Sequence, residues 1–381
     1  MVYACLFSMM GMGLTLTYMT TKVPNFAFGD IVTLGVYSSY TAVKVFNLNA
    51  YIGSAIGFVV GALVSAVMYL LVLRPLQRRG SSLVSLMIAT FGVDIGFVGI
   101  VEIYTNYLQY GLGHIDAPQF YALPDFSLFG YAGVAYAAPL SVVAIVLTIF
   151  LLFTRTKFGV AMRAAVENPP LARVLGINVD MVTTVSWMLA GGFAGYAGGL
   201  LTLQLPAGTA TGSNVIVEIF SSSVLGGLTS IFGAAVGGLI IGGSEILVTL
   251  GLGLGFGVIL TAIVAVLSIF IGVMIFFHKA KLPVFKIGDI TPWDVLNRDV
   301  VVSGQGALGL FLMVIGAYML FEMATGYTTD LFVGGLVNGF GANVTPFQQA
   351  IPLLIMVITL MVIPQGIFSV NYRRLLGKEK K

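Results

Sequence analysis

Residues 133–203 place a short charged segment between two long apolar ones. The apolar segments read GVAYAAPLSVVAIVLTIFLLF (133–153) and MVTTVSWMLAGGFAGYAGGLLTL (181–203). Between them, residues 155–180 read RTKFGVAMRAAVENPPLARVLGINVD. Each apolar segment has about the 20 residues that a transmembrane helix needs. The pattern therefore predicts two membrane spans joined by a short charged segment, which would face a partner at the membrane surface.

The composition of the whole chain indicates that lipid is its solvent. Of its 381 residues, 58% are hydrophobic and 9% are charged, whereas soluble domains carry about 25% charged residues. The apolar runs are continuous rather than alternating, which argues against a β-barrel. The net charge of +3 gives no reason to expect a nucleic-acid partner, and the single Cys5 excludes an internal disulfide. We expect an all-α polytopic membrane protein with about 9–11 transmembrane helices.

Eleven apolar segments are candidates for these helices. The segment at 214–229 is short enough to be re-entrant. The segments lie near 2–20, 26–43, 52–73, 83–101, 133–153, 181–203, 214–229, 231–250, 254–277, 306–325 and 346–368.

The positions of Lys and Arg give the orientation. Basic clusters follow the third segment (Arg74–Arg79), the fifth (Arg155–Arg173) and the ninth (Lys279–Lys286), and another closes the chain (Arg373–Lys381). If each segment crosses once, all four clusters lie on one side, which the positive-inside rule assigns to the cytoplasm. We therefore expect a multi-pass plasma-membrane protein with its C-terminus in the cytoplasm. Residues 2–20 lack the basic start of a signal peptide and are interpreted as a retained span.

No pattern in the chain predicts a catalytic or metal site. There is no HExxH, GxSxG or Cys/His cluster, and no GxxxxGK[ST] phosphate-binding loop. The chain is therefore not expected to be an enzyme or to bind a cofactor. If it needs energy for transport, that energy must come from a partner or an ion gradient. A few carboxylates lie at membrane depth, where such groups normally face a cavity or the bundle interior. Asp94, in the middle of the fourth segment, is the strongest candidate for lining a path.

Glycines recur at helical spacing. Residues four apart share one helix face, and small residues there let two backbones approach closely. We expect these stripes to serve helix packing, and sequence leaves open whether some contacts slide during gating. The glycines assigned to packing are Gly191, Gly195, Gly199, Gly226, Gly227 and Gly233.

The charged segment has the pattern of two short helices. Gly159 is expected at the start of a helix over 160–168, which Pro169-Pro170 would end or kink. A second helix over 170–175 would end at Gly176, since glycine suits a helix C-terminus. The two helices would lie along the cytoplasmic face and offer Arg163, Glu167 and Arg173 to a groove in a partner.

Four blocks of sequence carry a family resemblance. The charged segment fits T-x-x-G-x-A-x-R-A followed by G-I-N, with Gly159, Arg163 and Ala164 in the first part and Gly176 and Asn178 in the second. Residues 25–30 resemble N-F-A-H-G-D, with phenylalanine where histidine is usual; residues 86–92 resemble L-I-A-T-x-G; and residues 224–234 resemble V-L-G-G-L-G-S-I-x-G-A. In register, these blocks resemble the permeases of ABC importers for branched-chain amino acids, of the H-type subunit.

The resemblance implies a function and a set of partners. Such a permease would work with a second, M-type permease subunit, two ABC ATPases that use ATP, and an extracytoplasmic substrate-binding protein. Membrane lipid would surround its transmembrane helices. The segment 155–180 would couple the permease to the ATPases. The residues implied in coupling are Gly159, Arg163, Ala164, Glu167, Arg173, Gly176 and Asn178. The residues implied near the translocation path are Asn25, Phe26, Phe28 and Asp30, to which Asp94 is added from its position at membrane depth.

The chain departs from the family in length. We expect a permease core at 1–250, an atypical insert at 251–345 with about two extra membrane segments, and a last helix with a basic tail at 346–381. Branched-chain or other apolar amino acids are the expected substrates, and urea or short amides are the alternative. A secondary transporter driven by an ion gradient through Asp94 or Glu245 also stays open, but it would leave the charged segment unexplained.

Overall fold

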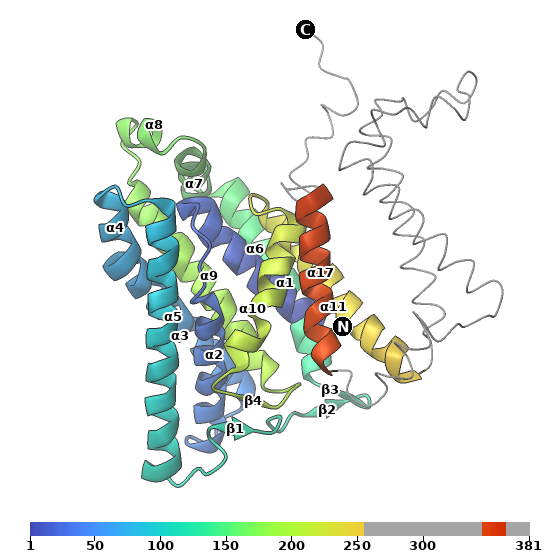
Figure 1. Cartoon of the computed structure of the whole chain (residues 1–381). Coiled ribbons are helices and arrows are strands. Elements are labelled where there is room, and N and C mark those ends of the chain that lie inside the picture. The colour runs from blue at the N-terminus through green and yellow to red at the C-terminus, as the bar shows by residue number, and fades with distance from the viewer. Residues whose placement is uncertain (255–344, 363–381) are drawn as a thin grey trace, which may run out of the picture. The chain divides into compact units, whose positions relative to one another are not determined.

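The computed structural model describes residues 1–254 and 345–362. They form helices with four two-residue strands, in line with the predicted all-α membrane fold (Figure 1). The predicted segments at 254–277 and 306–325, nearly all of the predicted insert at 251–345 and the basic tail lie outside the described residues. The chain divides into two compact units, Met1–Ser244 with Gln349–Lys381, and Glu245–Gln348. Most of the described residues belong to the first unit.

The helices follow the predicted apolar segments closely, and the bounds of all elements are as follows: α1 Val2–Thr21, α2 Phe28–Lys44, α3 Ala50–Met68, a π-helical turn η1 Tyr69–Leu73, α4 Arg74–Arg78, α5 Leu83–Asn106, a second π-helical turn η2 Tyr107–Gly111, β1 Gln119–Phe120, β2 Ser127–Leu128, β3 Tyr131–Ala132, α6 Val134–Arg155, α7 Lys157–Glu167, α8 Pro169–Val174, α9 Val179–Leu201, β4 Ala207–Gly208, α10 Thr211–Gly226, α11 Ile231–Leu254 and α17 Thr345–Val362.

Helix α9 is the centre of the unit, and α1, α2 and α3 pack around it. Its glycines make this possible, because a Cβ at Gly191 would collide with the carbonyl oxygen of Gly61, and one at Gly195 with that of Gly57. Gly35 of α2 approaches the carbonyl of Gly195 equally closely. Three helix backbones therefore meet at Gly195 with no side chain between them, which is the packing that small residues allow in membranes.

Helices α2 and α10 are too short to span a membrane alone. They have 17 and 16 residues, or roughly 24–26 Å of helix, against a hydrocarbon core of about 30 Å. The segment was predicted at 26–43, but its helix begins two residues later, at Phe28. Residues 22–27 connect α1 to α2 as irregular chain. Within it Val23, Asn25 and Ala27 are fully buried. Irregular backbone is tolerated at membrane depth only when it is covered by protein in this way.

Helix α3 continues through η1 into α4, five residues beyond the predicted end at 73. Proline inside a helix lacks the N–H that the carbonyl four residues earlier would accept from. Immediately before Pro75, the backbone N–H of Arg74 donates to the carbonyl of Tyr69, one residue further back than in an α-helix. This wider turn lets the helix pass Pro75 and carry its basic residues beyond the apolar part.

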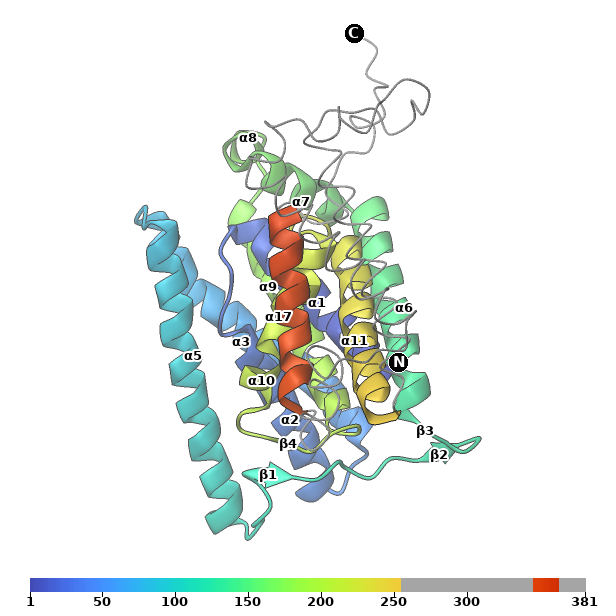
Figure 2. The same cartoon turned by 45° about the vertical axis from the view of Figure 1, so that its right-hand side comes forward.

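The outer helices expose their apolar side chains, as lipid contact requires. Four helical stretches of the described residues are long and apolar enough to cross a membrane, namely Val2–Thr21, Ala50–Arg78, Leu83–Gly111 and Val134–Arg155. The stretches that contain α5 and α6 are only 17% buried each, and Figure 2 shows both at the periphery.

The two ends of the unit differ in character. Helices α4, α7 and α8, which carry several Arg and Lys side chains, lie at one end, and the strands lie at the other (Figure 1). There β1 pairs with β4, and β2 with β3, both antiparallel. Lys44 of α2 forms an ion pair of 3.0 Å with Asp116 in the strand-bearing loop, which fastens that loop to the bundle.

Candidate coupling segment and translocation path

The charged segment folds as two short helices, α7 and α8, with a cap at each start. The Thr156 hydroxyl accepts a hydrogen bond from the Gly159 N–H at 3.2 Å. Asn168 ends α7 and caps α8, because its Oδ1 accepts from the Leu171 N–H at 3.1 Å. Such caps satisfy donors that the first helical turn leaves free. The two helices therefore turn sharply at one residue, with Pro169 at the first position of α8, where proline is well tolerated.

Two residues of the short link between α8 and α9 have a defined structural role. Gly176 has φ = 81°, a left-handed conformation that glycine adopts without strain, and it follows α8 as predicted. Asn178 then caps α9 by accepting from the Met181 N–H at 3.1 Å. Only residues 175–178 separate the two helices, so the link is short.

The segment has a buried face and an exposed one. Met162 and Ala165 of α7 and Ala172 of α8 are buried, and the Ser186 hydroxyl of α9 lies 3.6 Å from the Met162 sulfur. The charged side chains of Arg163, Glu167 and Arg173 are exposed, and Ala164 is partly buried between them. The segment is thus seated on the bundle by apolar contacts and presents charge away from it.

Gly159 differs from the prediction. It lies inside the first turn of α7, not before the helix, and Thr156 is the cap. A Cβ at Gly159 would collide with the backbone of Phe153 and Leu152 at the end of α6. The glycine therefore allows the tight junction between α6 and α7.

The predicted path residues mostly gather where the irregular segment meets α5. The Phe26 N–H donates to the Thr90 hydroxyl at 3.4 Å, and the Phe26 and Phe91 rings are 4.8 Å apart. The Asn25 side chain is fully buried, and neither its Oδ1 nor its Nδ2 has a hydrogen-bond partner among the described residues. Burying a polar group without a hydrogen-bond partner costs free energy. Asn25 is therefore an unusual polar residue at a depth where most of the chain is apolar.

Asp30 and Asp94 face each other across the contact between α2 and α5. Asp30 is 2% exposed, its Oδ2 has no hydrogen-bond partner among the described residues, and its carboxyl is close enough to Asp94 for the two groups to interact electrostatically. Asp94 lies on the same stripe of α5 as the buried Leu86, Thr90 and Val101. Phe28 lies apart from this group, buried against Gly13 of α1.

The glycines assigned to packing lie at helix contacts or turns. Gly191, Gly195 and Gly199 of α9 approach α3, while Gly226 of α10 touches Gly233 of α11. Gly227 ends α10 with φ = 96°.

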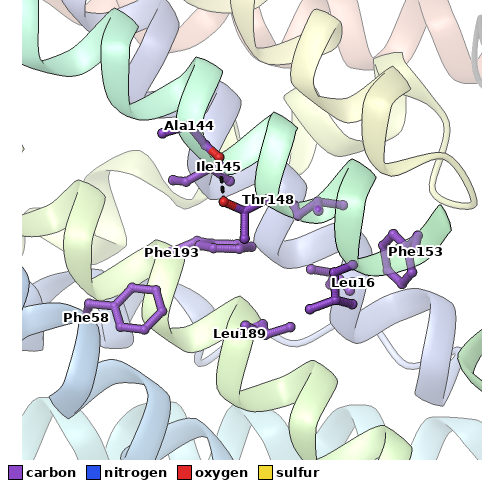
Figure 3. Close-up of a pocket in the computed structure, with 10 residues that line it drawn as sticks. Leu16, Phe58, Ala144, Ile145, Thr148, Phe153, Leu189 and Phe193 are labelled. Carbon is purple, nitrogen blue, oxygen red and sulfur yellow. Dashed lines mark hydrogen bonds between the residues drawn. The ribbon is translucent and has the colours of Figure 1, made fainter. Parts of the chain in front are cut away.

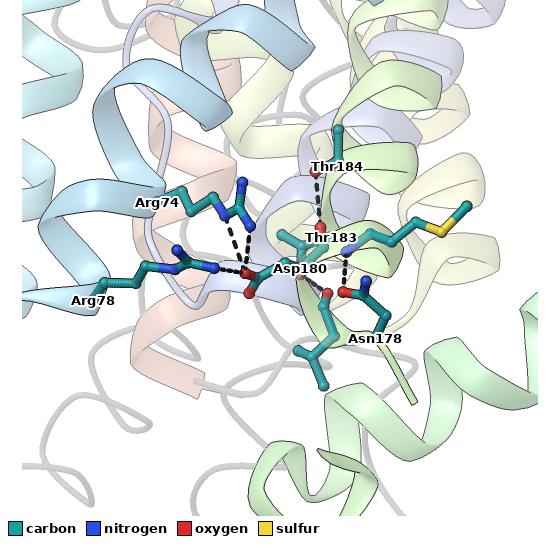
Figure 4. A network of polar contacts seen from close by, with 8 residues as sticks. Arg74, Arg78, Asn178, Asp180, Thr183 and Thr184 are labelled. Carbon is teal, nitrogen blue, oxygen red and sulfur yellow. Dashed lines mark hydrogen bonds and ion pairs between the residues drawn. The ribbon is translucent and has the colours of Figure 1, made fainter. Parts of the chain in front are cut away.

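One network was not predicted from sequence. Arg74 and Arg78 of α4 both donate to Asp180 Oδ2 in the first turn of α9 (Figure 4). The two arginines are four residues apart and so share a helix face, which is the only signal that the sequence offers. Asp180 lies 106 residues after Arg74 in the chain, so no local sequence pattern connects the arginines with their acceptor.

The described residues also line a partly open apolar pocket of about 200 Å³ among α1, α3, α6 and α9. Figure 3 shows Phe193 and Leu16 beside it, with the Thr148 hydroxyl turned back to its own helix, where it donates to the Ala144 carbonyl at 2.7 Å. None of the predicted path residues lines it. Within the described ranges, no group of three or more His, Cys, Asp or Glu could hold a metal ion.

Comparison with known proteins assigns the chain to a family. Residues 1–279 match the family described as branched-chain amino acid transport system / permease component. The chain is 42% identical over 256 residues to the probable branched-chain amino acid transport permease protein LivH of Methanocaldococcus jannaschii, covering 67% of this chain and 81% of the relative. It is 29% identical to the high-affinity LivH permease of Escherichia coli K12, covering 63% and 81%, and 26% identical to the ribose import permease RbsC of that strain, covering 62% and 72%. No solved structure matches. The chain belongs to the family of branched-chain amino acid transport system permease components.

Proposed function

We propose that this chain imports branched-chain or other apolar amino acids across the plasma membrane, paired with a second, M-type permease. Two ABC ATPases would dock on the cytoplasmic side, where the C-terminus would also lie, and an extracytoplasmic binding protein would deliver the substrate. The family makes the chain a multi-pass transport subunit rather than an enzyme, and ATP is used by partner subunits. The names of the similar LivH proteins favour branched-chain amino acids over urea or short amides.

The observation that carries the proposal is the capped pair of helices α7 and α8. Apolar residues seat both helices on the bundle, while Arg163, Glu167 and Arg173 remain exposed at the end that holds the basic residues. A charged surface held by fixed caps on a rigid bundle is suited to transmit a partner's motion, because a flexible loop would absorb it. We assign ATPase docking to this surface.

The path for substrate would run beside the irregular segment 22–27. The unpartnered Asn25 amide and the facing carboxyls of Asp30 and Asp94 are polar groups at membrane depth, and such groups usually mark a substrate or ion pathway. We propose that movement of α5 against α2 opens this place, while Phe28 shapes the opposite side.

The three-part organisation is proposed on the same basis. Residues 1–250 would form the transporting core, 251–345 an atypical insert with about two extra membrane segments, and 346–381 the last helix with its basic tail. The family match over 1–279 supports the first part.

Copurification and reconstitution test the function directly. The tagged chain should bring down an ATPase, a second permease and a binding protein from native membranes. Proteoliposomes of that complex should take up leucine when ATP is supplied with the ATPases, and should prefer leucine to urea or ribose. Uptake by the chain alone without ATP would favour an ion-coupled carrier, and uptake of urea in place of leucine would overturn the substrate assignment.

Charge reversal at Arg163 tests the docking surface. Arg163→Glu should leave the chain folded and inserted but reduce copurified ATPase about tenfold, as expected when a contact at an interface becomes repulsive. Arg79→Glu is the matched control, since Arg79 is exposed at the same end but lies outside α7 and α8. Equal ATPase binding by both variants would contradict the assignment.

A further inference from the structure

The ion-paired network at Asp180 holds the start of α9 against α4. Asp180 Oδ2 accepts from Arg74 Nε at 3.0 Å, from Arg74 Nη2 at 2.8 Å and from Arg78 Nη2 at 2.5 Å. Figure 4 shows both guanidinium groups converging on this one carboxylate beside Asn178, the cap of α9. An acid in the first turn of a helix is also favoured by the helix dipole. The contact lies two residues beyond the cap and so at the point where α8 connects to α9.

A second contact, between α9 and the π-helical turn η1 that precedes α4, lies one to two helical turns further into the membrane. The Tyr69 ring at the start of η1 stacks on the Trp187 ring of α9, with centroids 5.7 Å apart and planes at 30°. Trp187 directly follows Ser186, whose hydroxyl reaches Met162 of α7. Adjacent residues of α9 therefore contact the coupling segment and the continuation of α3.

The stacked rings belong to a small apolar cluster that includes the irregular segment. Its buried members are Val23, Ala27, Met68, Tyr69, Leu73, Leu86 and Trp187. Val23 and Ala27 flank Asn25 and Phe26, and Leu86 lies one turn before Thr90 on α5. The cluster joins the η1 turn directly to the backbone beside which the path is proposed.

We propose that Asp180, with Arg74 and Arg78, is the positioning contact that transmits displacement of α7–α8 to the irregular segment 22–27. The argument rests on the proposed function. Displacement of α7–α8 would move the start of α9 through the short link 175–178. The ion pairs of Asp180 with the two arginines would then move α4 and η1 in the same direction. The Tyr69–Trp187 stack would transmit this movement to Val23 and Ala27. The π-helical turn is the compliant part, since mid-helix turns of this kind often occur where a helix performs a function.

Most of the contacts that hold the bundle together lie outside the network. The side chains of Arg78, Arg74 and Asp180 are 63%, 33% and 23% exposed, so solvent screens the ion pairs in part and their loss should cost only a modest share of the stability. The apolar cluster and the glycine contacts of α9 remain when the ion pairs are lost. Substitution of Asp180 should therefore separate coupling from folding.

The experiment compares Asp180→Asn, Asp180→Glu and the control Arg79→Gln in the assembled transporter. Asp180→Asn should keep its ATPase subunits bound and hydrolysing ATP, while substrate moved per ATP falls about tenfold, within the usual range for coupling between sites. Asp180→Glu keeps the charge and should recover most of the loss. Unchanged transport per ATP in Asp180→Asn would overturn the proposal, and so would loss of ATPase binding, which would make the contact part of the docking surface.

A spectroscopic measurement tests the same contact without transport. The chain has two tryptophans, so Trp293→Phe leaves Trp187 as its single tryptophan reporter. In this background, and with the tryptophans of the ATPase and second-permease subunits replaced by phenylalanine, ATP binding by the ATPase subunits should shift Trp187 emission. Asp180→Asn should abolish the shift, and Arg79→Gln should preserve it. A full shift in Asp180→Asn, or no shift in the parent, would overturn the proposal, while failed ATP-driven uptake by the unaltered transporter would count separately against the proposed function.

Discussion

Substitution of Gly195 by alanine tests whether the three-helix junction holds the bundle together. A Cβ at this position would lie 2.8 Å from the Gly57 carbonyl carbon and 3.3 Å from the Gly61 Cα, and still closer to the Gly57 oxygen. Ordinary van der Waals contact begins at 3.4 Å, so α3 must move away by more than 0.6 Å (3.4 − 2.8). The atoms in the way belong to helix backbone, which cannot rotate aside like a side chain.

The cost of this movement can be estimated from overpacked cores. One inserted methyl group typically costs about 1–3 kcal/mol, and we expect the upper end, about 3 kcal/mol, because Gly35 of α2 also touches the Gly195 carbonyl. The assay is unfolding of the purified chain by SDS in mixed micelles, with the free energy of unfolding taken from the titration.

Gly96→Ala is the matched control for this measurement. Gly96 lies in α5, and no atom would meet its added Cβ within 4 Å. The change should be neutral or should stabilise the helix by up to about 1 kcal/mol, which is the propensity difference between the two residues. Equal free energies of unfolding for the two variants would refute the close-packing argument, because the same methyl group would then have no effect at the junction.

Three further changes test other parts of the structure. Asn168→Ala removes the cap of α8 and should destabilise that helix by about 1 kcal/mol, measured as faster amide hydrogen exchange over 169–174; unchanged exchange would show that the cap is dispensable. Asp94→Leu removes the group that faces buried Asp30 and should lower the free energy of unfolding by about 1–3 kcal/mol, whereas Asp94→Asn keeps a hydrogen-bonding partner and should stay near the parent; the opposite order would refute the pairing. Partial burial alone would raise the pKa of Asp116, but hydrogen bonds from Tyr40 and Lys44 hold this pKa below its usual 3.8. Its contribution to stability is therefore full above pH 3.8 and is lost as the pH falls through the lower folded pKa, so the difference in melting temperature between the parent and Asp116→Asn should close in that acid range and be constant above it.

The sequence predicted those elements whose causes are local. The order of proline, glycine and capping residues in 155–180 is enough to give two short helices, because each cap or break acts within a few residues. Gly176 was placed correctly for this reason. Gly159 was placed incorrectly, because its role depends on the backbone of α6 rather than on the start of α7.

The remaining errors come from contacts that a linear pattern does not contain. Residues 26–28 are apolar like most of the predicted segment 26–43, so the pattern could not indicate that Phe26 and Ala27 lie in irregular chain rather than helix. The apolar pattern also placed the end of the third segment at residue 73, before the basic residues of α4. The convergence of Arg74 and Arg78 on Asp180 requires the folded bundle, since more than one hundred residues separate the partners.

The π-helical turn before Pro75 also sets the rotational phase of everything after it. Each residue of an α-helix turns the chain by about 100°, and a turn of this kind accommodates one extra residue. Because the extra residue is absorbed within the wide turn, the five residues Tyr69–Leu73 cover roughly the angle that four residues cover in a regular α-helix. Deleting one of them would therefore leave Arg74 and Arg78 facing α9, whereas deleting one residue from the α-helical Ala50–Met68 would rotate both by about 100° around the helix axis, away from α9. The wide turn thus keeps both arginines in phase with Asp180 although the chain before Pro75 carries one residue more than a regular helix would need.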